Sequence, residues 1–129
     1  MSKELVLAVI ATALMLGSVH AQPLATTRTT LQQHDLSIPG REVVQARIDF
    51  APGVAAPPHT HPGEEIIYVL SGELEYRVGD GAPTTLHAGD VLFVPRGIVH
   101  SARNTGRGAA SELGTFIVDK GQPLLTVAH

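Results

Sequence analysis

Short segments in which apolar and polar residues alternate run through most of the chain. The clearest is residues 73–78, where Leu74, Tyr76 and Val78 alternate with charged residues and therefore share one face of an extended strand. Glycine, proline, aspartate and asparagine separate such segments at short intervals, as expected for tight turns. The segments predicted to be strands are residues 43–50, 65–70, 73–78, 84–87, 91–94, 99–102 and 112–118.

No ten-residue window beyond the first 21 residues has the 3.6-residue period of a helix, so the pattern predicts an all-β sandwich or barrel. The length of 129 residues suits one folded domain. A net charge of −3 gives no basic surface for nucleic acid. The absence of cysteine excludes disulfides and thiolate metal sites.

The N-terminal residues have the pattern of a secretory signal peptide. Lys3 precedes an apolar run from Leu5 to Leu16, and small residues lead to a cleavage site after Ala21. The alternative, a membrane helix, is disfavoured because the run is shorter than the ~20 residues of a span. We therefore expect residues 1–21 to be removed, leaving a periplasmic or secreted protein without a stable membrane anchor.

The rest of the chain is expected to divide into three parts. Residues 22–42 form an N-terminal arm, residues 43–120 form the β-barrel, and residues 121–129 form a C-terminal tail. The arm is rich in threonine and proline near its start, which suggests a linker or an extended segment.

Three histidines and an acidic pair indicate a metal site. His59 and His61 are two residues apart, so on a strand both imidazoles point to the same face. Glu64 and Glu65 follow closely, and His100 begins a later predicted strand. Neutral imidazoles with one carboxylate form a ligand set for a divalent first-row metal.

At these residues the sequence resembles the cupin superfamily. The spacing of its first motif is matched by Gly53, His59, His61, Glu65 and Gly72. The spacing of its second motif is matched by Gly89, Pro95, Gly97, His100 and Asn104. Only residues 73–88 separate the two motifs, as in compact single-domain bacterial cupins of type 2.

The resemblance implies a double-stranded β-helix, or jelly-roll barrel, with the metal bound inside. It implies His59, His61, Glu65 and His100 as ligands of one divalent transition metal, with Glu64 on the other side of its strand. The metal is manganese, iron, zinc, copper or nickel. One carboxylate among the ligands suits manganese or iron, whereas loading outside the cytoplasm favours zinc or copper.

A narrower resemblance is to germins, around residues 46–53, 57–62 and 89–97. Germins include manganese oxalate oxidases, in which two asparagines near the metal are thought to bind the acid. The matching positions here are Ala46 and Ala56. The germin resemblance therefore supports the fold and the ligands, but not oxalate as the substrate.

The sequence favours a metal-dependent oxidoreductase of the dioxygenase type, acting on a small oxygen-rich molecule that chelates the metal. Glu65 is the candidate catalytic residue, because a carboxylate ligand can also shuttle a proton when its metal bond loosens. The alternatives are a metal-dependent lyase, decarboxylase or isomerase, and a non-catalytic module that binds a small molecule or the metal. We also expect a homodimer, in which residues 24–45 cover an exposed strand edge.

Other residues have plainer interpretations. We expect His87 to be a surface residue and Asn104 to form a turn hydrogen bond. Tyr76 is expected in the core or at a subunit contact. Arg96 is expected to be solvated, with contact to an anionic substrate as the alternative.

Overall fold

A computed structural model describes residues 25–129, and within that range the chain forms strands but no helix. The expected signal peptide, residues 1–21, lies outside the described residues. The strands are β1 (Thr27–Asp35), β2 (Arg41–Phe50), β3 (Ala55–Thr60), β4 (Gly63–Ser71), β5 (Glu73–Val78), β6 (Thr84–His87), β7 (Val91–Val94), β8 (His100–Asn104), β9 (Ala110–Asp119) and β10 (Thr126–Val127).

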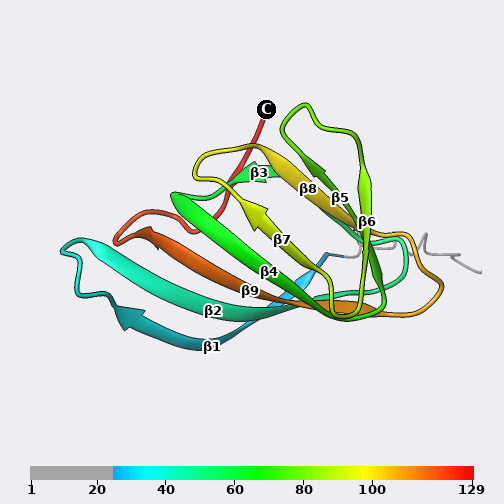
Figure 1. The fold of residues 1–129 in the computed structure, drawn as a ribbon, viewed down its shortest axis with the longest axis horizontal. Coiled ribbons are helices and arrows are strands. Elements are labelled where there is room, and N and C mark those ends of the chain that lie inside the picture. The colour runs from blue at the N-terminus through cyan, green and yellow to red at the C-terminus, as the bar shows by residue number, and fades with distance from the viewer. Residues whose placement is uncertain (1–24) are drawn as a thin grey trace, which may run out of the picture.

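The strands form two five-stranded sheets in which every pair is antiparallel. One sheet has the order β1-β2-β9-β4-β7 and the other has the order β10-β3-β8-β5-β6. The chain passes from one sheet to the other between β2 and β3 and again between β8 and β9, at the right of Figure 1. This is the predicted double-stranded β-helix, a jelly-roll of two facing sheets.

The core lies between the sheets because one face of each strand is apolar. On β2, Val44, Ala46, Ile48 and Phe50 are buried at every second position, as the two-residue period of a strand requires. They are joined by apolar residues of the opposite sheet, including Leu74 on β5 and Ala102 on β8. Burial of these side chains holds the two sheets together.

The predicted strands are present, with some changes at their ends. Residues 73–78, 84–87 and 91–94 have the predicted bounds, whereas β2, β4 and β9 each begin one or two residues earlier. Within the expected arm, β1 pairs with β2 of the same chain, and within the expected tail, β10 pairs with β3. All nine residues of β1 are exposed, so this strand has no buried apolar face to mark it in the sequence.

Residues 25–129 include no helix that is both long and apolar enough to cross a membrane.

Two glycines of the first motif adopt backbone conformations that other residues rarely take. Gly53 ends the turn after β2 with φ of 77°, and Gly72 joins β4 to β5 with φ of 76°. Their surroundings differ. A Cβ on Gly53 would have no atom within 4 Å, whereas on Gly72 it would lie 2.7 Å from the Ala109 carbonyl oxygen and from Ala110.

This difference makes the two glycines a matched pair for a stability measurement. Gly53→Ala should cost about 1–2 kcal/mol of unfolding free energy, because the left-handed conformation is strained for alanine. Gly72→Ala should cost about 1–3 kcal/mol more, because its methyl group also meets backbone. Urea unfolding followed by circular dichroism measures both, and equal losses would contradict the close packing at Gly72.

Candidate metal centre

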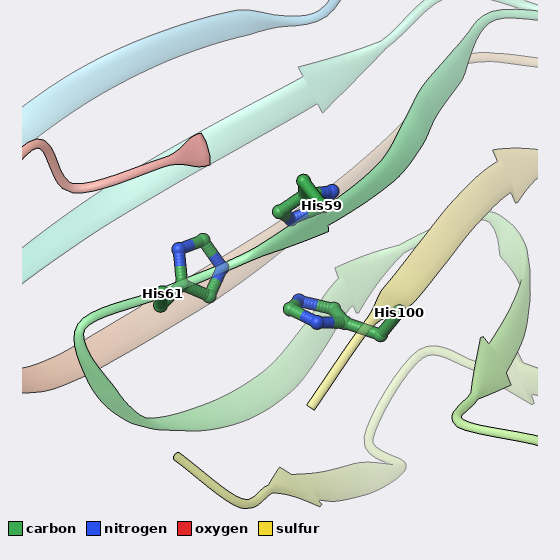
Figure 2. Close-up of side chains that lie close together, drawn as sticks. All are labelled: His59, His61 and His100. Atoms are coloured by element: carbon green, nitrogen blue, oxygen red, sulfur yellow. The ribbon is translucent and has the colours of Figure 1, made fainter. Parts of the chain in front are cut away.

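Three histidines from two neighbouring strands meet between the sheets. His59 lies on β3, His61 lies one residue beyond the end of β3, and His100 is the first residue of β8. The backbone pairing sets His59 opposite His100. In Figure 2 the three rings turn toward a common point, and their ligand nitrogens all lie within 4.8 Å of one another. These three side chains are buried and could hold a metal ion.

The backbone orients each imidazole through its Nδ1 atom. His59 Nδ1 lies 2.6 Å from the Pro57 carbonyl oxygen, and His61 Nδ1 lies 2.6 Å from that of Leu124. His100 Nδ1 lies 3.0 Å from the Ile98 carbonyl oxygen. A carbonyl oxygen only accepts, so the proton of each neutral ring sits on Nδ1 and the Nε2 lone pair is free. This is how metal-binding histidines are normally oriented.

The carboxylate of Glu65 completes the cluster from the opposite sheet. Its Oε2 atom lies 3.1 Å from His61 Nε2 and 3.2 Å from His100 Nε2. The contact between His61 Nε2 and this oxygen does not have the geometry of a hydrogen bond. No other group among residues 25–129 forms a hydrogen bond with His61 Nε2. His100 Nε2 is within hydrogen-bond distance of Glu65 Oε2, and a cation bound among these side chains would satisfy His61 Nε2 as well as the carboxylate.

Burial and neighbouring groups set the charge states of the cluster. Burial lowers the pKa of His59 to about 4, so this imidazole stays neutral and able to bind a metal in weakly acidic solution. Burial also raises the pKa of Glu65, but hydrogen bonds and charges of His100 and His61 outweigh it, and the net shift is downward. The site therefore presents a negative charge beside neutral nitrogen donors.

A cavity of about 330 Å³ opens beside the histidines, a size suited to a small molecule. Ile48, Phe50, Ala56, Ala102, Phe116 and Leu125 supply its apolar wall. Thr26, half-buried just before β1, and Arg28, exposed on β1, supply polar groups at its edge. The N-terminal arm and the C-terminal segment thus both line the cavity.

A second buried carboxyl group, Glu112 on β9, also lines this cavity. It accepts a hydrogen bond from the hydroxyl group of Tyr76, which reaches it from the opposite sheet. Burial, followed by the negative charge of Glu65, raises the pKa of Glu112 to about 8, although the bond from Tyr76 opposes this. Burial also raises the pKa of Tyr76. The pKa values of Glu65 and of Glu112 are thus shifted in opposite directions.

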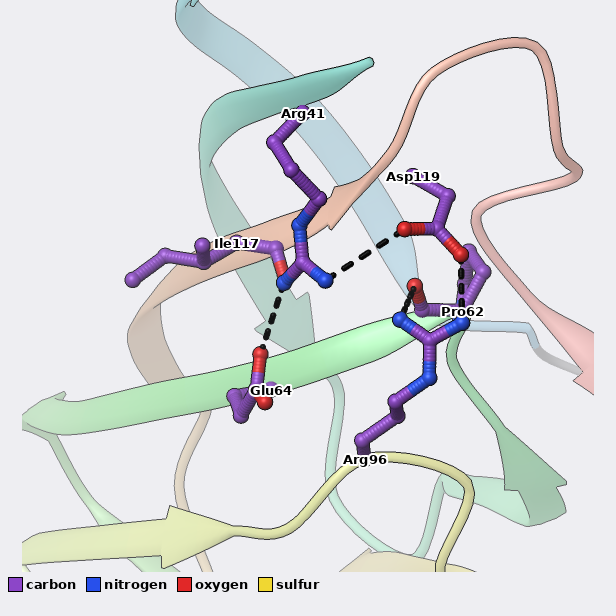
Figure 3. Close-up of polar contacts among 6 residues, drawn as sticks. All are labelled: Arg41, Pro62, Glu64, Arg96, Ile117 and Asp119. Atoms are coloured by element: carbon purple, nitrogen blue, oxygen red, sulfur yellow. Dashed lines mark hydrogen bonds and ion pairs between the residues drawn. The ribbon is translucent and has the colours of Figure 1, made fainter. Parts of the chain in front are cut away.

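Ion pairs brace the two segments that carry the histidines, as Figure 3 shows. Asp119, the last residue of β9, binds both Arg41 and Arg96. Arg96, in the turn before His100, also donates to the Pro62 carbonyl oxygen next to His61, at 3.2 Å. The Arg96–Asp119 hydrogen bond raises the pKa of Arg96 and lowers that of Asp119. Arg96 is thus exposed but paired, where solvation or substrate contact was expected.

The remaining candidate residues lie mostly where the sequence placed them. Glu64 is on the outer face of β4, where it accepts a hydrogen bond of 3.0 Å from Arg41. Asn104 holds its turn by bonds to the Phe50 and Gly108 carbonyl oxygens and from the Gly106 amide. His87 is exposed. Tyr76 is buried, but it lines the cavity in addition to packing in the core.

Sequence reasoning missed Glu112 and Arg28 as cavity residues. Glu112 belongs to no spacing motif, and charged residues are rarely buried, so it was counted only as part of a strand. A usable signal was present, because Glu112 is in phase with apolar Phe116 and Val118 on β9. Arg28 lies on an exposed strand and carries no comparable signal.

Comparison with known proteins agrees with this geometry. Residues 46–126 match the Cupin domain family. The chain belongs to the cupin family. Its matched region contains all four of the side chains that meet between the sheets, as well as Tyr76 and Glu112.

Germin-like proteins of plants are among the curated relatives of this cupin. Germin-like protein subfamily 2 member 2 of Arabidopsis thaliana is 45% identical over 87 residues, which cover 61% of this chain and 40% of that protein. Germin-like protein 1-1 of Oryza sativa subsp. japonica is 47% identical over 79 residues, which cover 57% of this chain and 37% of that protein. The cupin thus spans about two fifths of the length of these relatives.

Solved structures show the same fold. A protein with a double-stranded β-helix domain from Klebsiella pneumoniae has a TM-score of 0.69 at 26% identity, covering 86% of this chain and 90% of that one. A recombinant oxalate oxidase in complex with glycolate has a TM-score of 0.66 at 28% identity, and the match covers 83% of this chain and 57% of that one. The solved structures similar to this cupin thus include an enzyme.

The raised pKa of Glu112 predicts a pH-dependent stability. In the unfolded chain the pKa of Glu112 returns to 4.5. The neutral carboxyl group therefore makes its full contribution to the stability of the fold below pH 4.5, and this contribution is lost as the pH rises toward the folded-state pKa of about 8. Glu112→Gln cannot ionise. Its unfolding free energy relative to wild type should therefore rise across this interval, by at most about 1.4 kcal/mol per pH unit.

Denaturant unfolding of both metal-free proteins at several pH values measures this difference. A difference that stays constant from pH 4.5 to 8 would show that the buried carboxyl group titrates normally.

Proposed function

We propose that this cupin is an exported metal-dependent oxidoreductase of the dioxygenase type, acting on a small oxygen-rich molecule that chelates the metal. The observation that carries the proposal is the set of three buried imidazoles, each oriented through Nδ1 by a backbone carbonyl, with Glu65 close to the Nε2 atoms of His61 and His100, beside a cavity. His59, His61, Glu65 and His100 are the proposed ligands of one divalent transition metal. Their donor set suits manganese or iron.

A bound metal would hold and polarise the oxygens of the small molecule. The chain itself supplies the positioning. The backbone carbonyls hold the imidazoles, and Gly114 leaves room for Glu65, since a Cβ there would lie 3.0 Å from Glu65 Oε1. The apolar wall limits the access of water to the site. Glu65 is the proposed proton carrier, because its depressed pKa keeps it ionised and ready to accept a proton.

The enzymes among the similar solved structures support the assignment as an oxidoreductase and also suggest the main alternative reaction class. The oxalate oxidase structures are 26–28% identical to this chain. A DMSP lyase from Ruegeria pomeroyi, 28% identical with a TM-score of 0.61, has the same fold and makes a non-oxidative reaction the second candidate. Consumption of molecular oxygen distinguishes the two, because a dioxygenase places both oxygen atoms in its products.

Export and metal identity are linked parts of the proposal. The pattern of residues 1–21 supports secretion to the periplasm or beyond. A protein that folds there takes its metal there, where intrinsic affinity favours copper and zinc over manganese and iron. We therefore expect protein recovered from the periplasm to begin at Gln22 and to carry mixed metals, often zinc or copper. N-terminal sequencing and elemental analysis check this, and manganese or iron alone would contradict it.

A homodimer is the proposed assembly, and an exposed apolar face supports it. Ile66, Tyr68 and Leu70 on β4 lie beside Val91 and Phe93 on β7, the edge strand, and all five are exposed. Apolar patches next to an unpaired edge are typical of subunit contacts. Phe93→Asp should therefore yield monomers in light scattering, whereas Val127→Asp on β10, at an edge of the other sheet, should not.

The metal site predicts a matched set of histidine variants. His61→Ala and His100→Ala remove a nitrogen donor each and should weaken metal binding by more than about tenfold. His87→Ala removes an exposed histidine from the same fold and should bind metal like wild type. Titration of metal into the metal-free proteins measures the affinities, and equal affinities for all three variants would contradict the site.

Oxygen uptake tests the reaction class. Wild-type protein loaded with manganese or iron should consume oxygen with at least one member of a panel of flavonols and enediols, and His61→Ala should not. The His87→Ala variant should retain the rate. A fully loaded wild type that consumes no oxygen across the panel would refute the dioxygenase assignment and favour the lyase.

A further inference from the structure

Glu112 and Tyr76 form a polar contact across the cavity that lies apart from the proposed ligands. Glu112 projects from β9, where its backbone faces Ile48 of β2 and Val69 of β4. Tyr76 projects from β5 in the other sheet. Their hydrogen bond therefore joins the two sheets, and both side chains border the same space as the three histidines.

Among residues 25–129 no cation forms an ion pair with Glu112 that would explain an acidic group in this place. Only 4% of its surface is exposed, and its sole hydrogen bond from residues 25–129 goes from the Tyr76 hydroxyl to Oε2. The titratable and charged groups that line the cavity or act on Glu112 are Arg28, His59, His61, Glu65, Tyr76 and His100. None of them forms an ion pair with Glu112. The nearest charge that influences it is the carboxylate of Glu65, which is repulsive.

These surroundings make Glu112 a neutral carboxylic acid at neutral pH, consistent with its raised pKa. A neutral carboxylic acid has one O–H donor. Its hydrogen bond with Tyr76 is one in which the Tyr76 hydroxyl donates and the carboxyl oxygen Oε2 accepts. The other carboxyl oxygen, Oε1, has no hydrogen-bond partner among the described residues, and Glu112 lines the cavity. Buried polar groups are normally paired, so this oxygen points to a partner that enters the cavity.

Building on the proposed function, we propose that Glu112, oriented by Tyr76, is the substrate-binding acid of this cavity and donates a hydrogen bond to an oxygen of the molecule held at the metal. Apart from the three histidines, these two residues are the buried polar groups of the cavity lining. The rest of the buried wall is apolar, and the other polar side chains of the lining, Thr26 and Arg28, lie at its edge. The pair selects small molecules that carry a carboxylate, carbonyl or enolate oxygen beyond their chelating atoms.

Glycolate is a suitable probe, because it has carboxylate and hydroxyl oxygens and fits a cavity of this size. Calorimetric titration of glycolate into manganese-loaded protein at pH 7 compares wild type with two variants. Glu112→Gln keeps a donor and should bind glycolate within about threefold of wild type. Glu112→Leu has a similar volume without a donor and should bind about tenfold more weakly. Equal affinities for wild type and Glu112→Leu would overturn the proposal.

Infrared spectroscopy provides a second reading that does not require metal or turnover. Wild type at pH 7 should show the carbonyl band of a protonated carboxyl group, which Glu112→Gln lacks. Addition of glycolate should shift this band, and Tyr76→Phe should change its position. A band that is absent at pH 7, or that glycolate leaves unmoved in loaded protein, would overturn the proposal.

The two proposals fail in different ways. Failure to bind metal would refute the metal-dependent function, while the carbonyl band of Glu112 in metal-free protein would still report whether the acid is protonated. Normal metal binding and oxygen uptake with full glycolate affinity in Glu112→Leu would refute the acid alone. Unfolding midpoints and metal content of each variant confirm that the comparison is made between folded, loaded proteins.

Discussion

The constraint on which the site depends is the burial of a carboxylate opposite imidazole lone pairs. Three backbone carbonyls fix the Nδ1 protons of His59, His61 and His100, so the rings cannot satisfy Glu65 by switching tautomer without losing those bonds. The fold is rigid enough to hold this arrangement because β3 and β8 are paired and β4 lies in a sheet with β9. A shared cation resolves the conflict with the smallest change of structure.

Two buried glutamates near the histidines have pKa values shifted in opposite directions. His100 and His61 lower the pKa of Glu65, whereas burial and the charge of Glu65 raise the pKa of Glu112. Groups whose environments separate their pKa values can divide acid and base roles between them. The ion pairs of Asp119 with Arg41 and Arg96 lie outside this space, and they steady the turns that carry His61 and His100.

The all-β class and the clustering of the histidines could be predicted from local geometry, whereas the jelly-roll fold and the ligand set followed from the resemblance to cupins. The motif glycines mark tight turns, and His59 and His61 share a face through the period of a strand. Glu112 and Arg28 could not be placed in the same way, since their position depends on which strands face each other across the barrel. Strand β1 was missed because pairing with β2, not an apolar face of its own, makes it a strand.

The bond from His61 to Leu124 has a further consequence. Leu124 lies after β9, only a few residues from the C-terminus, so the last part of the chain completes the support of a histidine near its middle. The short pairing of β10 with β3 keeps this segment in place. A purification tag fused after His129, or proteolytic trimming of the last few residues, would therefore disturb metal affinity from a distance along the sequence, and an untagged or N-terminally tagged protein is the safer material for loading studies.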